Sequence, residues 1–167
     1  MRRVAVTGLG VVSPQGQGVA ALWASAVAGQ SAIGLLQTPF AQRLRSPLAA
    51  RCDFDGAAHF DSPQLRQLDR ISQMALVASR QALADAPFTF DRSRAGVFIG
   101  TGMGGTLSMD EGYQTLYADG SERIKPFTVL LGMHNAPAAW VAIEHGFKGS
   151  NLTYSTACSS STVAIGE

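Results

Sequence analysis

The segment at residues 151–167 constrains the fold most strongly, because a β-rich stretch leads through a tight turn directly into a helical pattern. Residues 151–156 alternate and carry β-branched and aromatic side chains, which predicts a strand. Cys158 then opens a run of Ser, Ala, Val and Ile that suits a buried helix. A strand, turn and helix in this order lift the side chain at the turn out of the backbone, which favours Cys158 as a nucleophile.

The surroundings expected for Cys158 match that role. A thiol in the first turn of a helix lies next to unpartnered backbone N–H groups and the positive end of the helix dipole, which stabilise a thiolate. The same N–H groups can hold an oxyanion after sulfur attacks a carbonyl carbon. The alternative is a packing role, because cysteine is among the most frequently buried residue types. The strand–turn–helix context favours the nucleophile.

Composition limits the partners of the chain. Hydrophobic residues make up 46% of the sequence and charged residues only 15%, against about 25% charged residues in a typical soluble domain. We therefore expect apolar surface that a partner subunit or a further part of the same polypeptide covers. The net charge of +1 gives no field that favours nucleic acid.

Cysteine and histidine spacing gives no sign of a metal site or a disulfide framework. Cys52 and Cys158 lie far apart, and the three histidines show no ligand spacing. No apolar run reaches the length needed to span a membrane. We expect a cytoplasmic protein with both thiols free, no metal and no membrane contact.

Strands and helices alternate along the chain. Strands are predicted at residues 3–7, 94–99 and 151–156, and a long irregular excursion at 30–61. This order predicts a layered α/β fold with a largely parallel sheet. Because the apolar helix after Cys158 needs layers on both sides, residues 1–167 are expected to be one N-terminal domain of a longer polypeptide, truncated just after that cysteine. Helices are predicted at about 19–28, 61–86, 108–118, 135–145 and after 158.

A glycine-rich turn after the strand at 94–99 has two interpretations. Gly100, Gly102 and Gly105 match the dinucleotide-binding pattern G-x-G-x-x-G, with Asp119 as a candidate ribose-binding acid. The following residues are too polar and glycine-broken for the helix that should carry a pyrophosphate, and no clear strand ends near Asp119. We favour close backbone packing as the role of these glycines.

Four sequence blocks together resemble the N-terminal half of β-ketoacyl-acyl carrier protein synthases, the condensing enzymes of thiolase-like fold. They read RVAVTGLGVVSP at 3–14, DRISQMAL at 69–76, GVFIGTGMGG at 96–105 and NLTYSTACSSS at 151–161. The last block is the most specific, since the family's active-site signature centres on this cysteine. Gly149-Ser150 departs from the usual Gly-Pro of the family at a turn.

The resemblance implies a layered αβαβα architecture, of which this chain is the N-terminal portion, and a decarboxylative Claisen condensation. Cys158 would accept an acyl group as a thioester, and its backbone N–H would be one oxyanion donor. Substrates would be carried on the phosphopantetheine of an acyl carrier protein, with no other cofactor. The family's two catalytic histidines and lysine follow later than residue 167, so this chain alone is expected to be inactive. None of its own histidines sits in those motifs.

The resemblance also assigns roles to residues away from the cysteine. Met103 matches a residue that gates the acyl channel, the alternative being core filler. Thr128 matches a position that one subunit contributes to the end of the acyl pocket of its partner subunit. The alternative is a solvent-exposed turn. A basic patch on which the carrier protein docks would comprise Arg66, Arg70, Arg123 and Lys125. For each of these residues the alternative is an ordinary solvent-exposed position.

The family forms homodimers through the strand before the cysteine, and some members form heterodimers with a related subunit that lacks it. The presence of Cys158 makes this chain similar to the catalytic member. Two other functions stay open: a non-catalytic half-protein or interaction module of the same fold, and a dinucleotide-binding domain. Fatty acid, polyketide and polyene pathways are not distinguished.

Overall fold

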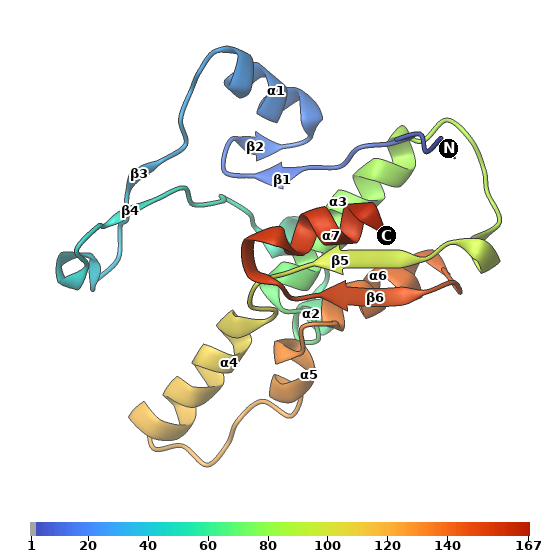
Figure 1. Ribbon diagram of the computed structural model, residues 1–167. Helices are drawn as coiled ribbons and strands as arrows, with labels where there is room; N and C mark the ends of the chain where they lie inside the picture. The colour runs from blue at the N-terminus through green and yellow to red at the C-terminus, as the bar shows by residue number, and fades with distance from the viewer. Residues whose placement is uncertain (1–2) are drawn as a thin grey trace. The chain divides into compact units, whose positions relative to one another are not determined.

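The computed structural model describes residues 3–167 in two compact units (Figure 1). The first comprises the chain up to Asp55 together with Val77–Pro87, and the second comprises Gly56–Leu76 together with Phe88–Glu167. Helix α3 (Arg70–Asp85) contributes its first half to the second unit and its second half to the first.

The first unit contains two short antiparallel strand pairs, helix α1 (Val19–Val27) and the second half of α3. Strand β1 (Val12–Ser13) pairs antiparallel with β2 (Gly16–Gln17), and α1 follows. Gly29 follows the end of α1 with φ of 63°, the left-handed conformation that glycine adopts at no steric cost. The predicted irregular excursion holds only β3 (Gly34–Leu35), its antiparallel partner β4 (Leu48–Ala49), and the 3₁₀ turns η1 (Ala41–Arg43) and η2 (Gly56–Ala58), the last in the second unit.

The strand predicted at residues 3–7 is wrong. This segment has no strand pairing, and Val4 and Val6 are 94% and 80% exposed. A strand needs a partner for its backbone groups, and in this unit the chain that follows bonds instead to the second half of α3. Leu9 N donates to Asp85 Oδ2 at 3.0 Å, and Val11 N to Gln81 Oε1 at 2.8 Å.

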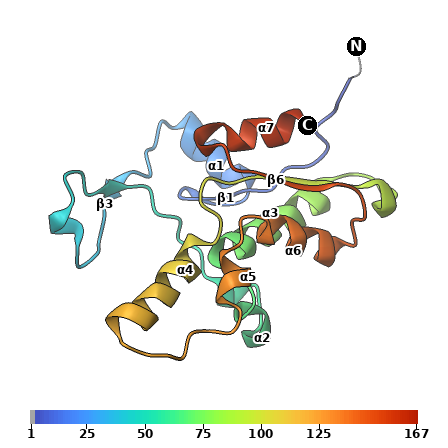
Figure 2. The same cartoon turned by 60° about the horizontal axis from the view of Figure 1, so that its bottom comes forward.

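The second unit is built on the parallel pair β5 (Val97–Gly100) and β6 (Asn151–Tyr154). Helix α7 (Ser160–Gly166) covers one face of the pair and α6 (Ala136–His145) covers the other (Figures 1 and 2). These three layers confirm the predicted α/β class. Gly146 ends α6 with φ of 67°, as the sequence predicted.

Four further elements lie in this unit. The 3₁₀ turn η3 (Arg92–Arg94) precedes β5, and helix α4 (Thr106–Tyr113) continues into the π-helical turn η4 (Gln114–Ala118). Helix α5 (Thr128–Gly132) packs beside α4 (Figures 1 and 2). The buried apolar core of the unit consists of Phe60, Leu68, Leu76, Val97, Leu131, Ala136, Ala138 and Val141.

The single helix predicted at 61–86 is interrupted. The chain forms a short α2 (Ser62–Leu65), started by the predicted cap at Asp61, and begins α3 only at Arg70. Asp69 explains the break, since its buried carboxylate accepts from Ile71 N at 2.9 Å and from Ser108 in α4 through Oγ at 2.6 Å and N at 3.0 Å. One carboxylate thereby caps two helices, which an unbroken helix would prevent.

Within residues 3–167, none of the helices combines the length and the apolar character that crossing a membrane requires.

Asp69→Ala should lower the free energy of unfolding by about 2–4 kcal/mol, because three half-buried donors lose a buried charged acceptor. Asp61→Ala is the matched control: Asp61 is an exposed cap of α2 that accepts from Gln64 N at 2.8 Å, so its loss should cost about 1 kcal/mol. Urea denaturation followed by circular dichroism measures both. Equal losses would contradict the bridging role of Asp69.

Candidate functional site

Cys158 lies in a turn between β6 and α7. The chain leaves β6 after Tyr154, passes through the 3₁₀ turn η5 (Ala157–Ser159) and begins α7 at Ser160. Ala157 has φ of 52°, and among the described residues no other non-glycine residue has positive φ. The turn presents the Cys158 side chain to solvent. The sequence predicted Cys158 in the first turn of the helix, whereas the structure places it in the 3₁₀ turn η5 that directly precedes α7.

The hydroxyl of Ser160 fixes the shape of this turn. Its Oγ accepts from Thr156 N at 2.8 Å and lies within donating distance of Ala157 O, at 2.7 Å, and of Thr101 O, at 3.2 Å. Ser160 is buried. Because Thr101 directly follows β5, the hydroxyl ties the turn after β6 to the end of the neighbouring strand.

A backbone donor is available beside the sulfur. In the turn, Ser159 N donates to Thr156 O at 3.3 Å and Ser160 N donates to Ala157 O. Across residues 3–167 the structure provides no hydrogen-bond acceptor for the N–H of Cys158. An unpartnered N–H at the start of a helix is the kind of donor that holds an oxyanion.

Three of the glycines at the end of β5 and in the loop after it lie against protein backbone. A Cβ on Gly100 would overlap the peptide that joins Ser160 and Ser161, and a Cβ on Gly105 would overlap the Leu131 carbonyl. Gly104 has φ of 58° and lies against His134. These contacts favour close packing, rather than a dinucleotide, as the reason for Gly100, Gly104 and Gly105, whereas nothing lies within 4 Å of the Cβ position at Gly102.

Asp119, the candidate ribose-binding acid, follows the π-helical turn η4 and no strand. Its N–H donates to Gln114 O at 3.0 Å, which ends that turn. The structure therefore lacks, around Asp119, the strand end that a dinucleotide-binding fold requires.

Met103 lies at the same end of the sheet as Cys158. It belongs to the loop that follows β5, and the turn after β6 reaches this loop through Ser155 Oγ, 3.4 Å from Gly102 O. Met103 is 69% exposed, so it does not fill the core of this unit. Its position is compatible with a gate, which stays a prediction.

Thr128 is the first residue of α5 and is only 7% exposed. Its Oγ1 donates to Lys125 O at 2.9 Å, and its methyl group faces Gly112 of α4. The solvated turn is therefore not its environment. Thr128 contacts α4 rather than the Cys158 turn, so its role in a partner's pocket stays a prediction.

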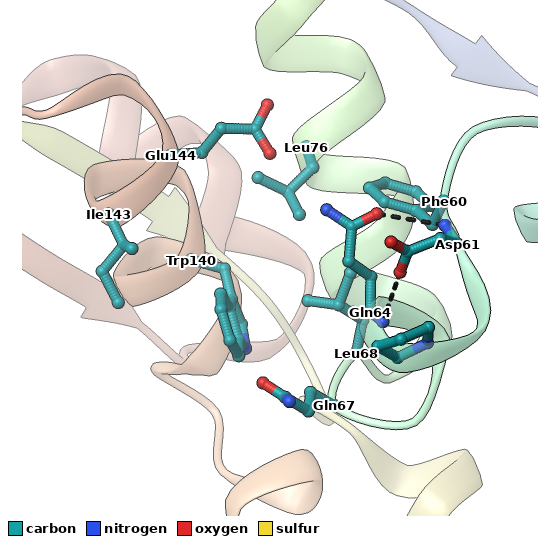
Figure 3. A pocket seen from close by; sticks show the side chains of 10 residues that line it. Phe60, Asp61, Gln64, Gln67, Leu68, Leu76, Trp140, Ile143 and Glu144 are labelled. Carbon is teal, nitrogen blue, oxygen red and sulfur yellow. Dashed lines mark hydrogen bonds between the residues drawn. The ribbon is translucent and has the colours of Figure 1, made fainter.

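Two cavities in the second unit were not foreseen from the sequence. The first, of about 310 Å³, lies between α2, α3 and α6, with Trp140 and Ile143 on the α6 side (Figure 3). The second, of about 660 Å³, lies between the turn that joins α2 to α3 and the helices α4 and α5. Neither is lined by Cys158, Met103 or Thr128.

The second cavity brings together three members of the predicted basic patch. Arg66, Arg70 and Lys125 all line it, whereas Arg123 does not. Lys125 Nζ forms an ion pair with Glu111 Oε2 at 2.7 Å. Within residues 3–167 there is no group of three or more His, Cys, Asp and Glu side chains that could hold a metal ion.

The arrangement defines an α/β protein with a solvent-facing thiol where a strand meets a helix, next to a backbone donor. Residues 1–167 match the family described as beta-ketoacyl synthase, N-terminal domain. The chain belongs to the beta-ketoacyl synthase family.

Curated relatives include a 3-oxoacyl-acyl-carrier-protein synthase and a putative polyketide beta-ketoacyl synthase. The chain is 34% identical to a 3-oxoacyl-acyl-carrier-protein synthase 2 of Coxiella burnetii, over 99% of this chain and 41% of that protein. It is 37% identical to a putative polyketide beta-ketoacyl synthase 1 of Streptomyces halstedii, over 99% and 42%. The chain thus spans about two fifths of the length of these relatives.

Solved structures share the fold. A beta-ketoacyl synthase from Burkholderia phymatum is 30% identical with a TM-score of 0.80, over 99% of this chain and 42% of that one. The ishigamide ketosynthase/chain length factor is 25% identical with a TM-score of 0.80, over 96% and 46%. A type II polyketide ketosynthase in complex with its acyl carrier protein is 24% identical with a TM-score of 0.77, over 96% and 44%. These likenesses confirm the predicted N-terminal portion of a thiolase-like α/β architecture.

Gly100→Ala should destabilise the protein by about 1–3 kcal/mol, because its Cβ meets the backbone at the start of α7. Gly102→Ala provides the matched control, since nothing lies within 4 Å of the Cβ position at Gly102, and we expect a change within about 0.5 kcal/mol. Thermal and urea unfolding measure the difference. Indistinguishable variants would refute the packing role of Gly100.

Proposed function

We propose that the complete protein is an acyltransferase that catalyses decarboxylative Claisen condensation, with Cys158 as its nucleophile. The observation that carries the proposal is the exposed Cys158 thiol on a tightly bonded strand-to-helix turn, beside an N–H without an acceptor among residues 3–167. The proposal is supported by the family membership and by the similarity to a 3-oxoacyl-acyl-carrier-protein synthase and a putative polyketide beta-ketoacyl synthase. Because the chain spans only two fifths of those relatives, the activity is proposed for the whole protein.

The reaction proceeds in two halves. The Cys158 thiolate attacks the carbonyl carbon of an acyl thioester, the oxyanion forms at the backbone N–H, and the phosphopantetheine sulfur leaves as a thiolate. A malonyl thioester then loses carbon dioxide, and the resulting enolate carbon attacks the acyl-Cys158 thioester. The cysteine leaves as a thiolate, and the new carbon–carbon bond gives a β-ketoacyl product. A soft thiolate suits both steps, as nucleophile and as leaving group. No cofactor besides the carrier's phosphopantetheine is required.

Supporting roles follow from position. Met103, exposed on the loop linked to the Cys158 turn, gates the entry of the acyl chain. Thr128, buried at the start of α5, contributes to the end of a partner's pocket. The thiols are kept reduced in the cytoplasm, where the protein functions.

An acidic acyl carrier protein docks on the basic patch that includes Arg66, Arg70, Arg123 and Lys125. The gathering of three of these side chains around one cavity supports this partner, and complementary charge would accelerate association. A second synthase subunit, identical or related, pairs along β6, whose Leu152 is 46% exposed. Edge strands are ready sites for such pairing.

The nucleophile can be tested by labelling and by substitution in the complete protein. Iodoacetamide should modify the exposed Cys158 before the half-buried Cys52, and peptide mass spectrometry identifies the site. Cys158→Ala should abolish acyl transfer from an acyl carrier thioester, whereas Cys52→Ala should retain it. Transfer that survives Cys158→Ala would refute the proposed function.

The docking patch can be tested at Arg123, which lies outside the second cavity. Arg123→Glu should raise the dissociation constant for an acidic acyl carrier protein about tenfold at low salt, because an attraction becomes a repulsion. Arg45→Glu reverses an exposed charge in the first unit and should leave affinity nearly unchanged. Surface plasmon resonance at several salt concentrations measures both, and an equal effect of the two variants would exclude this docking face.

A further inference from the structure

The second cavity combines an apolar interior with a basic edge. Its volume of about 660 Å³ falls within the range of about 300–1,000 Å³ that small-molecule sites occupy. Its lining comes from three places in the sequence: the turn around residues 65–73, α4 at residues 107–111, and residues 125–131 leading into α5. Cys158 is not among these residues.

Leucine, proline and phenylalanine side chains form the apolar part of the lining. Leu68 and Leu131 are buried and form its interior, while Leu107 and Phe127 are 49% and 44% exposed along its walls. Exposed leucine and phenylalanine side chains that converge on one concave space favour a ligand with a hydrocarbon portion.

The charged part of the lining favours an anion. Lys125 is neutralised by Glu111 at 2.7 Å, and the Asp69 carboxylate is occupied by three hydrogen bonds. Arg66 is exposed and forms no ion pair with any carboxylate among residues 3–167. Its guanidinium can bind a carboxylate through two parallel hydrogen bonds.

We propose that this cavity binds a single-chain fatty acid, with the carboxylate on Arg66 and the hydrocarbon chain along Leu107, Phe127 and Leu131. The charge at one edge and the apolar interior match the two ends of such an amphiphile. The site is separate from Cys158, and its occupancy does not require condensation activity. Because Arg66 also belongs to the proposed docking patch, a bound fatty acid would compete with the carrier protein.

Isothermal titration calorimetry with hexanoate, octanoate and decanoate tests the hydrocarbon part. Affinity should rise by up to about tenfold for each two added methylene groups, as apolar surface is buried. Decanol, which has the chain without the charge, and acetate, which has the charge without the chain, should bind much more weakly than decanoate. Affinity that does not depend on chain length would overturn the proposal.

Two variants assign binding to this cavity. Arg66→Gln and Leu107→Ser should each weaken decanoate binding about tenfold or more, and both positions are exposed enough for the fold to persist, which circular dichroism checks. Arg45→Gln is the matched control in the first unit. Unchanged decanoate affinity in both variants would overturn the proposal.

Competition separates this site from the proposed docking function. Arg123→Glu should weaken carrier binding and leave decanoate binding intact, since Arg123 does not line the cavity. If decanoate fails to bind while Arg66→Glu still weakens carrier binding, the cavity is only part of a protein-docking face and the fatty acid site is wrong. If decanoate fails to bind and Leu107→Ser shifts the protein to a smaller assembly, measured by light scattering, the occupant is a second copy of the chain.

Discussion

The close approach of α7 to the end of β5 is the constraint on which the candidate site depends. Gly100 has no side chain, so the peptide between Ser160 and Ser161 lies directly against it. Ser160 then bonds to the carbonyl of Thr101, and the same hydroxyl closes the turn that holds Cys158. Two features thus determine the position of the sulfur: the absence of a side chain at Gly100 in β5, and the Ser160 hydroxyl in the turn that follows β6.

This constraint connects the two loops at the carboxyl end of the parallel pair. The glycine-rich loop after β5 and the cysteine turn after β6 are joined by Ser155 and Ser160. Open α/β sheets commonly place their active groups at this edge. In this chain, a member of the beta-ketoacyl synthase family, that edge carries the exposed thiol of Cys158.

The sequence predicted local features well where the deciding contacts lie within a few residues. The caps at Asp61 and Gly146, the strand at β6 and the turn at Cys158 were all visible in the pattern. The break at Asp69 was not, because its partner Ser108 lies 39 residues away. The alternating valines of residues 3–7 suggested a strand, but alternation does not specify a hydrogen-bonding partner. The 660 Å³ cavity also escaped detection, since its walls come from three separate segments.

The left-handed conformation of Ala157 determines how the turn holds Cys158. A non-glycine residue at φ of 52° carries an unfavourable backbone energy of about 1–3 kcal/mol. The surrounding hydrogen bonds offset that energy once, when the chain folds. The turn is therefore set when the chain folds, and under the proposed function the Cys158 thiol would be preorganised before an acyl group arrives.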